Sequence, residues 1–133
     1  LLLLTDNGKI QNRITNPEFK LGKTYLVQLE GLIDTNTLKQ LSEGILLNDG
    51  LTKPAEAIQI STPSDLWERS PPIRFRKNIP TSWIQLKIYE GKNRQIRRMT
   101  AALGYPTLRL VRISIGEWGL GELRPGQHKQ ISI

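Results

Sequence analysis

The densest run of chemically capable side chains lies between Glu90 and Met99, where the sequence reads Glu-Gly-Lys-Asn-Arg-Gln-Ile-Arg-Arg-Met. We predict a helix that begins within this run, and the positive end of a helix dipole disfavours cations at such a start. An anionic partner should therefore face the segment. Four cations carry this prediction: Lys92, Arg94, Arg97 and Arg98.

The cations of this predicted helix do not all point the same way. On a helical wheel, Arg94 and Arg98 point away from an apolar stripe, whereas Arg97 lies at its border. Arg97 is therefore the one cation placed to turn inward. The stripe consists of three residues: Ile96, Met99 and Leu103.

The overall charge points in the same direction. The chain of 133 residues carries a formal net charge of +7, which favours a polyanionic partner, with nucleic acid first and an anionic membrane second. Arg109 and Arg112 follow the basic helix closely. A charge cluster is also commonly a solvated face, so spacing alone leaves a nucleic-acid surface and a solvated surface as alternatives.

Several other kinds of chemistry lack the residues that they need. The sequence has no cysteine, which excludes disulfides, thiolate metal sites and cysteine nucleophiles. It has no glycine-rich phosphate loop, no zinc-ligand spacing and no serine triad. The single histidine, His128, lies among turn residues near the C-terminus, and we expect it to be a solvated surface residue.

The apolar patterning predicts one α+β domain over residues 1–133, with a mixed, mainly antiparallel sheet and a few helices packed on it. Alternation places Tyr25, Val27 and Leu29 on one face of a strand at 23–30. By this pattern alone, Tyr25 and Leu110 are ordinary core residues. Further elements are expected as strands at 1–4, 57–60, 83–89 and 108–115, helices at 35–41 and around Ile10 and Ile14, and a tight turn at 48–50.

Two of these segments carry further expectations. In the strand at 108–115, Val111, Ile113 and Ile115 are predicted to share one face, opposite to that of Arg112. The stretch 61–80 is rich in serine and proline, encloses a basic run at 74–77, and is predicted to be an exposed excursion. No run reaches the length of a membrane-spanning helix, so we expect a soluble, cytoplasmic chain without a membrane partner.

Several of these blocks together resemble a known family. The runs Gly-Lys-Asn-Arg-Gln-Ile-Arg-Arg-Met at 91–99 and Gly-Tyr-Pro-Thr-Leu-Arg-Leu-Val-Arg at 104–112, followed by Ile115-Gly116, are similar to the signature of the RsuA/RluE group of bacterial ribosomal RNA pseudouridine synthases. Residues 23–27 resemble the tyrosine strand of that group, and residues 51–55 its middle loop. Pro-Pro-Ile-Arg at 71–74 resembles a segment of its large-subunit, E-type members. The resemblance covers residues 1–133.

The resemblance implies an isomerase that breaks the glycosidic bond of a uridine, turns the base and rejoins its C5 to ribose C1′, without a cofactor or a metal. The target nucleotide would be flipped out of stacked RNA, and a basic surface would hold the phosphates on either side. The E-type likeness implies a uridine in 23S rRNA, with 16S rRNA as the alternative target. The cations expected to hold the RNA are Lys92, Arg94, Arg98, Arg109 and Arg112.

The resemblance also implies catalytic-site roles for three residues. Arg97 matches the arginine whose guanidinium pairs with the catalytic aspartate and keeps its carboxylate ionised and oriented. Tyr25 matches the aromatic residue that stacks on the target base and whose hydroxyl is available for proton transfer. Leu110 matches the apolar residue that lines the same pocket.

The catalytic aspartate is where this sequence departs from the family pattern. In the family it belongs to a Gly-Arg-Leu-Asp block, and residues 1–5 resemble the segment directly after that block. Asp6 falls in a turn on the far side of the predicted strand and cannot substitute for it. We therefore expect the nucleophile just before Leu1, in a segment that was cut away or left out. The residues from Leu1 onward should not catalyse isomerisation by themselves.

Two other functions stay open beside the enzyme. One is a non-catalytic RNA-binding module that uses the same basic face, and the other is a ribosome-assembly protein whose charge serves only assembly. For the module, Arg94→Ala and Arg98→Ala should weaken RNA binding and flatten its salt dependence, while Tyr25→Phe should change nothing measurable. For the enzyme, we expect a monomer that acts on folded ribosomal RNA.

Overall fold

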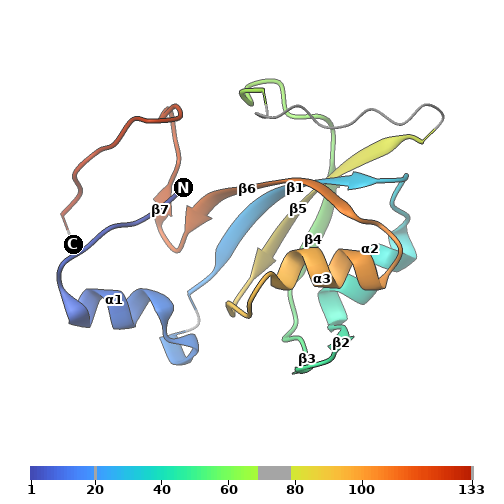
Figure 1. The fold of residues 1–133 in the computed structure, drawn as a ribbon, viewed down its shortest axis with the longest axis horizontal. Coiled ribbons are helices and arrows are strands. Elements are labelled where there is room, and N and C mark those ends of the chain that lie inside the picture. The colour runs from blue at the N-terminus through green and yellow to red at the C-terminus, as the bar shows by residue number, and fades with distance from the viewer. Residues whose placement is uncertain (20, 69–78, 133) are drawn as a thin grey trace.

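The computed structural model of the chain describes residues 1–19, 21–68 and 79–132 (Figure 1). Within these ranges the helices are α1 (Gly8–Thr15), the short 3₁₀ helix η1 (Pro17–Phe19), α2 (Thr35–Glu43) and α3 (Gln95–Ala102). The strands are β1 (Lys23–Glu30), β2 (Leu46–Leu47), β3 (Gly50–Leu51), β4 (Glu56–Ile60), β5 (Thr81–Ile88), β6 (Thr107–Ile115) and β7 (Trp118–Gly119).

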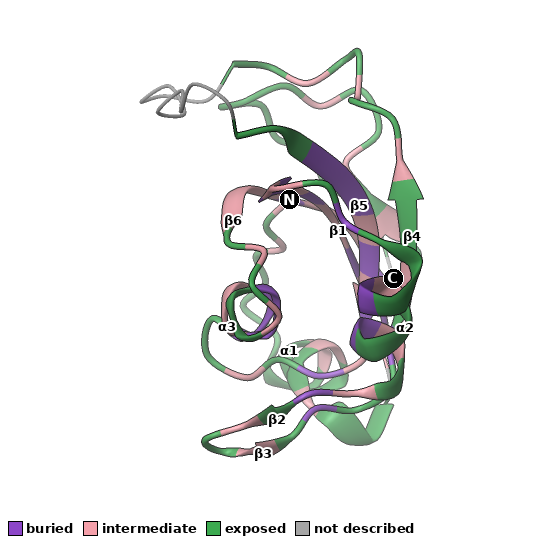
Figure 2. Cartoon of the chain, turned by 90° about the vertical axis from the view of Figure 1, so that its right-hand side faces the viewer, coloured by how far each residue is buried: buried purple, intermediate pink, exposed green. Residues whose placement is uncertain are grey.

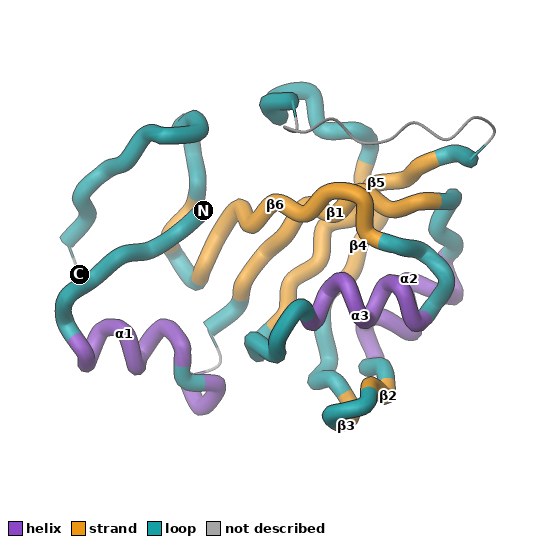
Figure 3. The backbone as a smooth tube through the Cα atoms, viewed as in Figure 1, coloured by secondary structure: helices purple, strands orange, loops and turns teal. Residues whose placement is uncertain are grey.

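A five-stranded sheet in the order β4-β5-β1-β6-β7 forms the centre of the fold, and every neighbouring pair in it is antiparallel (Figure 3). The strands β2 and β3 pair separately as a small hairpin, whose turn is the tight turn predicted at 48–50. The predicted α+β class with a mainly antiparallel sheet is confirmed.

The core lies between one face of the sheet and the helices α2 and α3. Val27 of β1 pairs with Ile84 of β5 and with Leu110 of β6, so these three side chains share a face. Leu41 of α2 and Met99 of α3 belong to the same buried cluster, and both are 0% exposed. Figure 2 shows the buried stretches of β5 and α3 facing the interior. The predicted alternation of β1 and the apolar stripe of α3 are therefore confirmed.

Polar groups set the ends of the helices. The side-chain oxygen of Asn7 accepts hydrogen bonds from the backbone N–H groups of Lys9 and Ile10, and it begins α1. The Asp34 carboxylate accepts from the N–H of Thr37 at 2.7 Å and begins α2 in the same way. The helix α3 begins only at Gln95, because the preceding residue has a left-handed backbone. The first cations of the basic run therefore lie in the loop before the helix.

The predicted strand at 1–4 is wrong. Leu2 is 70% exposed and Leu4 is 88% exposed, and no strand within the described ranges pairs with these residues. A strand needs a neighbour that supplies a ladder of backbone hydrogen bonds. Here the segment is held at its first residue, whose ammonium group donates to the Arg112 carbonyl at 2.8 Å.

The strand β6 departs from its predicted faces because its pairing with β1 contains a β-bulge. Tyr25 pairs with Arg112, but the register shifts at the preceding residue of β1, which leaves Ile113 as the extra residue of β6. A bulge re-aims the side chains that follow it. Ile115 consequently lies with Arg112 along one cleft, so the predicted common face with Val111 is wrong for Ile115.

The remaining expectations concern the surface. Residues 61–68 and 79–80 have neither helix nor strand, in agreement with the excursion predicted there, while the basic run at 74–77 and the block at 71–74 lie outside the described residues. His128 is exposed, as predicted. None of the helices in the described ranges is long and apolar enough to cross a membrane.

Candidate functional site

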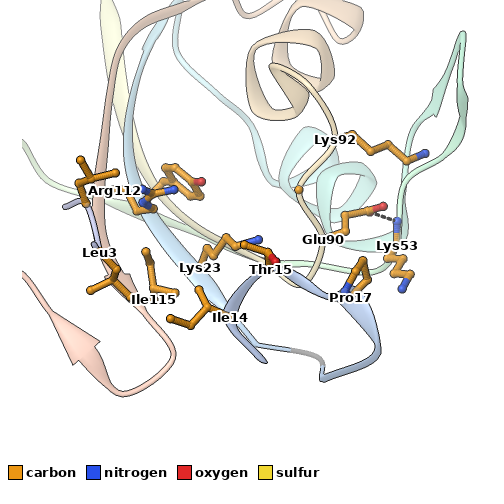
Figure 4. A pocket seen from close by; sticks show the side chains of 13 residues that line it. Leu3, Ile14, Thr15, Pro17, Lys23, Lys53, Glu90, Lys92, Arg112 and Ile115 are labelled. Carbon is orange, nitrogen blue, oxygen red and sulfur yellow. Dashed lines mark hydrogen bonds between the residues drawn. The ribbon is translucent and has the colours of Figure 1, made fainter. Parts of the chain in front are cut away.

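A cleft of about 630 Å³ opens beside the first residues of β1 (Figure 4). Its walls come from β1, from the end of β6, from the loops that follow β3 and precede α3, and from residues near the N-terminus. The cleft therefore gathers segments that lie far apart in the sequence, from Leu2 to Ile115. Six of its residues carry ionisable side chains that could act on a ligand: Lys23, Tyr25, Lys53, Glu90, Lys92 and Arg112.

The charge of the cleft is strongly positive. Four of the six residues are cations, and Glu90 is the one carboxylate among those lining residues that the structure describes. Burial lowers the pKa of the Lys23 ammonium from its ordinary value, and the nearby Arg112 guanidinium lowers it further. An anion in the cleft would relieve this repulsion, so the site is suited to a negatively charged ligand.

Tyr25 is the aromatic residue of the cleft. It is half-buried on β1, between Leu86 of β5 and Arg112 of β6, and part of its ring packs against the hydrophobic core. Its hydroxyl makes no hydrogen bond to any described residue. The side chain thus offers a flat apolar face and an available hydroxyl at the same position, which suits contact with a nucleobase.

Arg112 joins the N-terminal residue to the cleft. Its Nε and Nη2 atoms donate to the Leu1 carbonyl at 2.9 and 2.8 Å, and the Leu1 ammonium donates back to the Arg112 carbonyl at 2.8 Å. Residues at the very start of the sequence therefore lie beside the strand pair that carries Tyr25.

Arg97 lies on α3, half-buried, as its place at the border of the apolar stripe predicts. Its Nη1 atom donates to the carbonyl of Thr107, the first residue of β6, at 3.4 Å. The hydroxyls of Thr107 and Thr100 lie 2.8 Å apart beside this contact. Arg97 therefore packs toward the sheet, but the structure does not bring it into the lining of the cleft that contains Tyr25.

Leu110 lies two residues before Arg112 on β6 and packs, half-buried, against the core. It pairs with Val27 of β1, so it is a diagonal neighbour of Tyr25 on the same face of the sheet. It does not itself line the cleft. Tyr25 and Leu110 thus share one face of the sheet, Arg97 lies on helix α3, and Tyr25 alone of the three lines the cleft.

The five predicted RNA-binding cations lie at different places and have different partners. Lys92 and Arg112 line the cleft, and Arg94 is exposed in the loop before α3. Arg98 makes a two-pronged ion pair with Asp49 of the hairpin, at 2.9 and 3.2 Å. Arg109 stacks over an aromatic ring 5.6 Å away and donates to the carbonyl of the same residue, Trp67.

Sequence reasoning missed four residues of this region: Lys23, Lys53, Glu90 and Gln95. A signal existed for each of them. Lys23 belongs to the tyrosine-strand block and Lys53 to the middle-loop block, and Tyr25 was the one residue of these two blocks for which a role was predicted. Glu90 and Gln95 belong to the basic run itself, for which roles were predicted only for the cations. Burial, which the sequence does not reveal, distinguishes Glu90 and Gln95 from the other polar residues of the run: Glu90 is 7% exposed and Gln95 is 3% exposed.

Comparisons with known proteins agree on one family. Residues 1–102 match the family model described as RNA pseudouridylate synthase. The chain is 54% identical over 127 residues to the ribosomal large subunit pseudouridine synthase E of Xanthomonas campestris, covering 96% of this chain and 68% of that relative. It is 50% identical over 133 residues to the protein of the same name from Vibrio parahaemolyticus, covering 100% of this chain and 56% of the relative.

A solved structure described as a crystal structure of pseudouridylate synthase superposes with a TM-score of 0.66 at 33% identity, covering 86% of this chain and 43% of that one. The chain therefore spans only part of the length of the relatives that it matches. Because a family model covers most of its residues and close relatives cover nearly all of them, the resemblance seen in the sequence is confirmed: the chain belongs to the RNA pseudouridylate synthase family.

Proposed function

We propose that this chain is the catalytic part of a ribosomal RNA pseudouridine synthase that isomerises a uridine of large-subunit (23S) rRNA. The observation that carries the proposal is the position of Tyr25 in a cleft lined by Lys23, Lys92 and Arg112, within a member of the RNA pseudouridylate synthase family. The large-subunit target rests on the names of the relatives from Xanthomonas and Vibrio.

In the proposed reaction the N1–C1′ bond of the uridine breaks, the base turns, and a C5–C1′ bond forms. The proton that C5 loses is balanced by the proton that N1 gains, so no co-reactant is consumed. Tyr25 would stack on the base while it turns, and its hydroxyl would pass the proton. A half-buried ring with an available hydroxyl supports both roles.

The nucleophile in this proposal is an aspartate that precedes Leu1. Its support is the contact of Leu1 with Arg112, the residue that pairs with Tyr25, since a carboxylate a few residues upstream would then be within reach of the same cleft. Arg97 would pair with that carboxylate, and Leu110 would supply apolar contact beside Tyr25, although neither residue is among those that line the cleft. The half-buried Arg97 and the proximity of Leu110 to Tyr25 support these roles.

The RNA would be held by phosphate contacts from both the cleft and the helix side. Lys92 and Arg112 line the cleft, and Arg94 is exposed. Four of the cations would first have to exchange a protein partner for a phosphate: the Asp49 carbonyl for Lys92, the Leu1 carbonyl for Arg112, the Asp49 carboxylate for Arg98 and the Trp67 carbonyl for Arg109. This arrangement predicts strongly salt-dependent binding. We further expect a monomer in the cytoplasm.

The test has two arms. The first measures binding of the 133-residue chain to unmodified 23S and 16S rRNA fragments over a range of salt. The second measures uridine isomerisation by a protein in which the upstream segment of the Xanthomonas relative is joined to Leu1, with Tyr25→Phe as a matched variant. We expect preferential action on 23S rRNA and a loss of at least about a hundredfold in rate for Tyr25→Phe at little cost in affinity.

The outcomes separate the candidate functions. Binding without isomerisation by the extended, folded protein would favour the non-catalytic RNA-binding module and contradict the enzyme. Modification of 16S rather than 23S rRNA would keep the enzyme and overturn its target. RNA affinity that does not change when the uridines are replaced, and that depends only on charge, would favour a role in ribosome assembly.

A further inference from the structure

Glu90 is a buried carboxylate at the wall of the cleft, shortly after the end of β5. It is 7% exposed, and its Oε2 atom accepts hydrogen bonds from the backbone N–H of Lys53 at 2.6 Å and from the Nε2 of Gln95 at 3.1 Å. Figure 4 shows the contact between Glu90 and Lys53 across the cleft wall. Burial of a carboxylate is unfavourable unless hydrogen bonds compensate it, and here the two donors come from segments far apart in the sequence.

Gln95 extends this connection within the loop that precedes α3. It is 3% exposed, and its Oε1 accepts from the backbone N–H of Lys92 at 3.2 Å while its Nε2 donates to Glu90. The chain of contacts therefore runs from Lys53 through Glu90 and Gln95 to Lys92. We call these four residues the Glu90 network.

The two ends of the Glu90 network are cleft cations that no regular element holds in place. Lys53 lies in the loop after β3 and Lys92 in the loop before α3, and both line the cleft. The network holds each of them by its backbone N–H, so the side chain of each lysine does not take part in it. Its effect is to fix the two loops relative to each other.

We propose that Glu90 is a positioning residue for RNA, whose buried carboxylate sets the separation of the Lys53 and Lys92 side chains so that both contact phosphates of the bound strand. This inference rests on the proposed function, because it takes the cleft as the RNA site. It also adds Lys53 to the phosphate contacts. A precise separation of two cations matters because phosphates recur at a regular spacing along the backbone.

Two substitutions with the same change in charge separate positioning from electrostatics. Both donors reach the same atom of Glu90, Oε2, so Glu90→Gln can keep an acceptor oxygen at that point, whereas Glu90→Met has a side chain of similar length and no such acceptor. Each variant loses one negative charge, so electrostatics alone would strengthen RNA binding in both. Positioning predicts the opposite sign for Glu90→Met: weaker binding, by about tenfold.

Glutamine at position 90 is therefore the matched control. In Glu90→Gln the side-chain oxygen accepts from the backbone N–H of Lys53 and from the Nε2 of Gln95, while its own amide nitrogen takes the place of Oε1. Both hydrogen bonds to position 90 are kept without the charge. We expect its affinity to stay within about threefold of the wild type.

The experiment measures RNA affinity, thermal unfolding and amide hydrogen exchange at Lys53 and Lys92 for the wild type, Glu90→Met, Glu90→Gln and Glu43→Gln. Glu43 lies at the exposed end of α2 and has the same change in charge. Adding Lys53→Ala to Glu90→Met should reduce RNA affinity much less than it does in the wild type, since the lysine would already be displaced.

Each outcome decides a different point. If the wild type does not bind RNA, the proposed function fails, while slow exchange of the Lys53 amide would still report the network. If the wild type binds and Glu90→Met binds as well or better, the positioning role is wrong. If Glu90→Gln folds normally and keeps slow exchange of the Lys53 amide but binds RNA as weakly as Glu90→Met, the network exists without serving RNA, and the inference is again overturned.

Discussion

The carboxylate of Asp49 accepts hydrogen bonds from Nη1 and Nη2 of Arg98, at 2.9 and 3.2 Å, and so ties the tip of the β2–β3 hairpin to helix α3. The hydrogen bond with Arg98 lowers the pKa of the Asp49 carboxyl and raises that of the Arg98 guanidinium. The Lys92 ammonium donates to the Asp49 carbonyl at 3.5 Å. Two cations expected to hold RNA are therefore bound to the hairpin in the absence of RNA.

This pairing predicts that Asp49 competes with phosphates. Asp49→Asn should tighten RNA binding by about threefold at low salt, because Arg98 would no longer exchange a carboxylate for a phosphate. Asp65→Asn supplies the matched control, since Asp65 is exposed and carries the same charge. Titrations of labelled RNA measure the affinity of both variants. Equal gains in RNA affinity for Asp49→Asn and Asp65→Asn would mean that only the net charge controls binding.

A second prediction concerns Arg94, whose φ of 50° lies in the left-handed region. Glycine adopts this backbone without a steric penalty, so Arg94→Gly should stabilise the fold by about 1 kcal/mol. It should also weaken RNA binding several-fold through the lost cation. Arg94→Ala keeps the strain, and we expect it to lose affinity with no gain in the free energy of unfolding. Urea unfolding and RNA titration report the two effects separately.

Gly44, at the end of α2, combines two constraints. Its φ is +118°, and a Cβ there would lie 2.5 Å from the Thr52 carbonyl oxygen, a backbone atom with little freedom to move. Gly44→Ala should therefore destabilise the protein by about 3 kcal/mol. Gly104 ends α3 at φ +85° with open space around it, so Gly104→Ala should cost only about 1 kcal/mol. Similar losses in urea unfolding would refute a steric contribution at Gly44.

The last prediction is a dependence of stability on alkaline pH. The Tyr89 hydroxyl donates to Glu56 at 2.5 Å, and this hydrogen bond raises the pKa of Tyr89 above its ordinary value. A raised pKa means that the contribution to stability is complete below the tyrosine pKa of the unfolded chain, about 10, and is lost as pH rises through the higher folded value.

The measurement compares urea unfolding of the wild type and Tyr89→Phe between about pH 8 and about pH 11. The difference in unfolding free energy should shrink as the pH rises. Glu56→Gln should abolish most of this dependence, because the carboxylate is what opposes ionisation of the hydroxyl. A difference that stays constant across the range would show that the hydrogen bond does not control the titration.

Local patterns in the sequence were sufficient for most elements. The alternation of Tyr25, Val27 and Leu29 predicted both the limits and the buried face of β1, because side chains of a strand point to its two faces in turn. Ile96 and Met99 likewise predicted the buried side of α3. These inferences depend only on neighbours within one element, so they do not require knowledge of the rest of the fold.

Long-range pairing explains the errors of these patterns. The apolar run at 1–4 has the composition of a strand, but strand formation also requires a partner, and none is present within the described ranges. Alternation along β6 fails at Ile113, because the bulge arises from the register with β1 rather than from the residues of β6 themselves. The hairpin contact of Arg98 was invisible for the same reason, since Asp49 lies 49 residues away.

The sequence alone establishes which chemistry is available to this protein. Its composition shows an excess of cations and a lack of cysteine. Its local patterns predict the strand that carries Tyr25 and contain the motif blocks of an RNA pseudouridylate synthase. Which of these residues meet depended on the folded chain. Folding brings Tyr25 and Arg112 together across two strands and buries Glu90 and Gln95 between two loops. The guanidinium of Arg97, on α3, instead contacts the start of β6. Residue type sets what a side chain can do, but burial and distance come from packing between segments far apart in the chain.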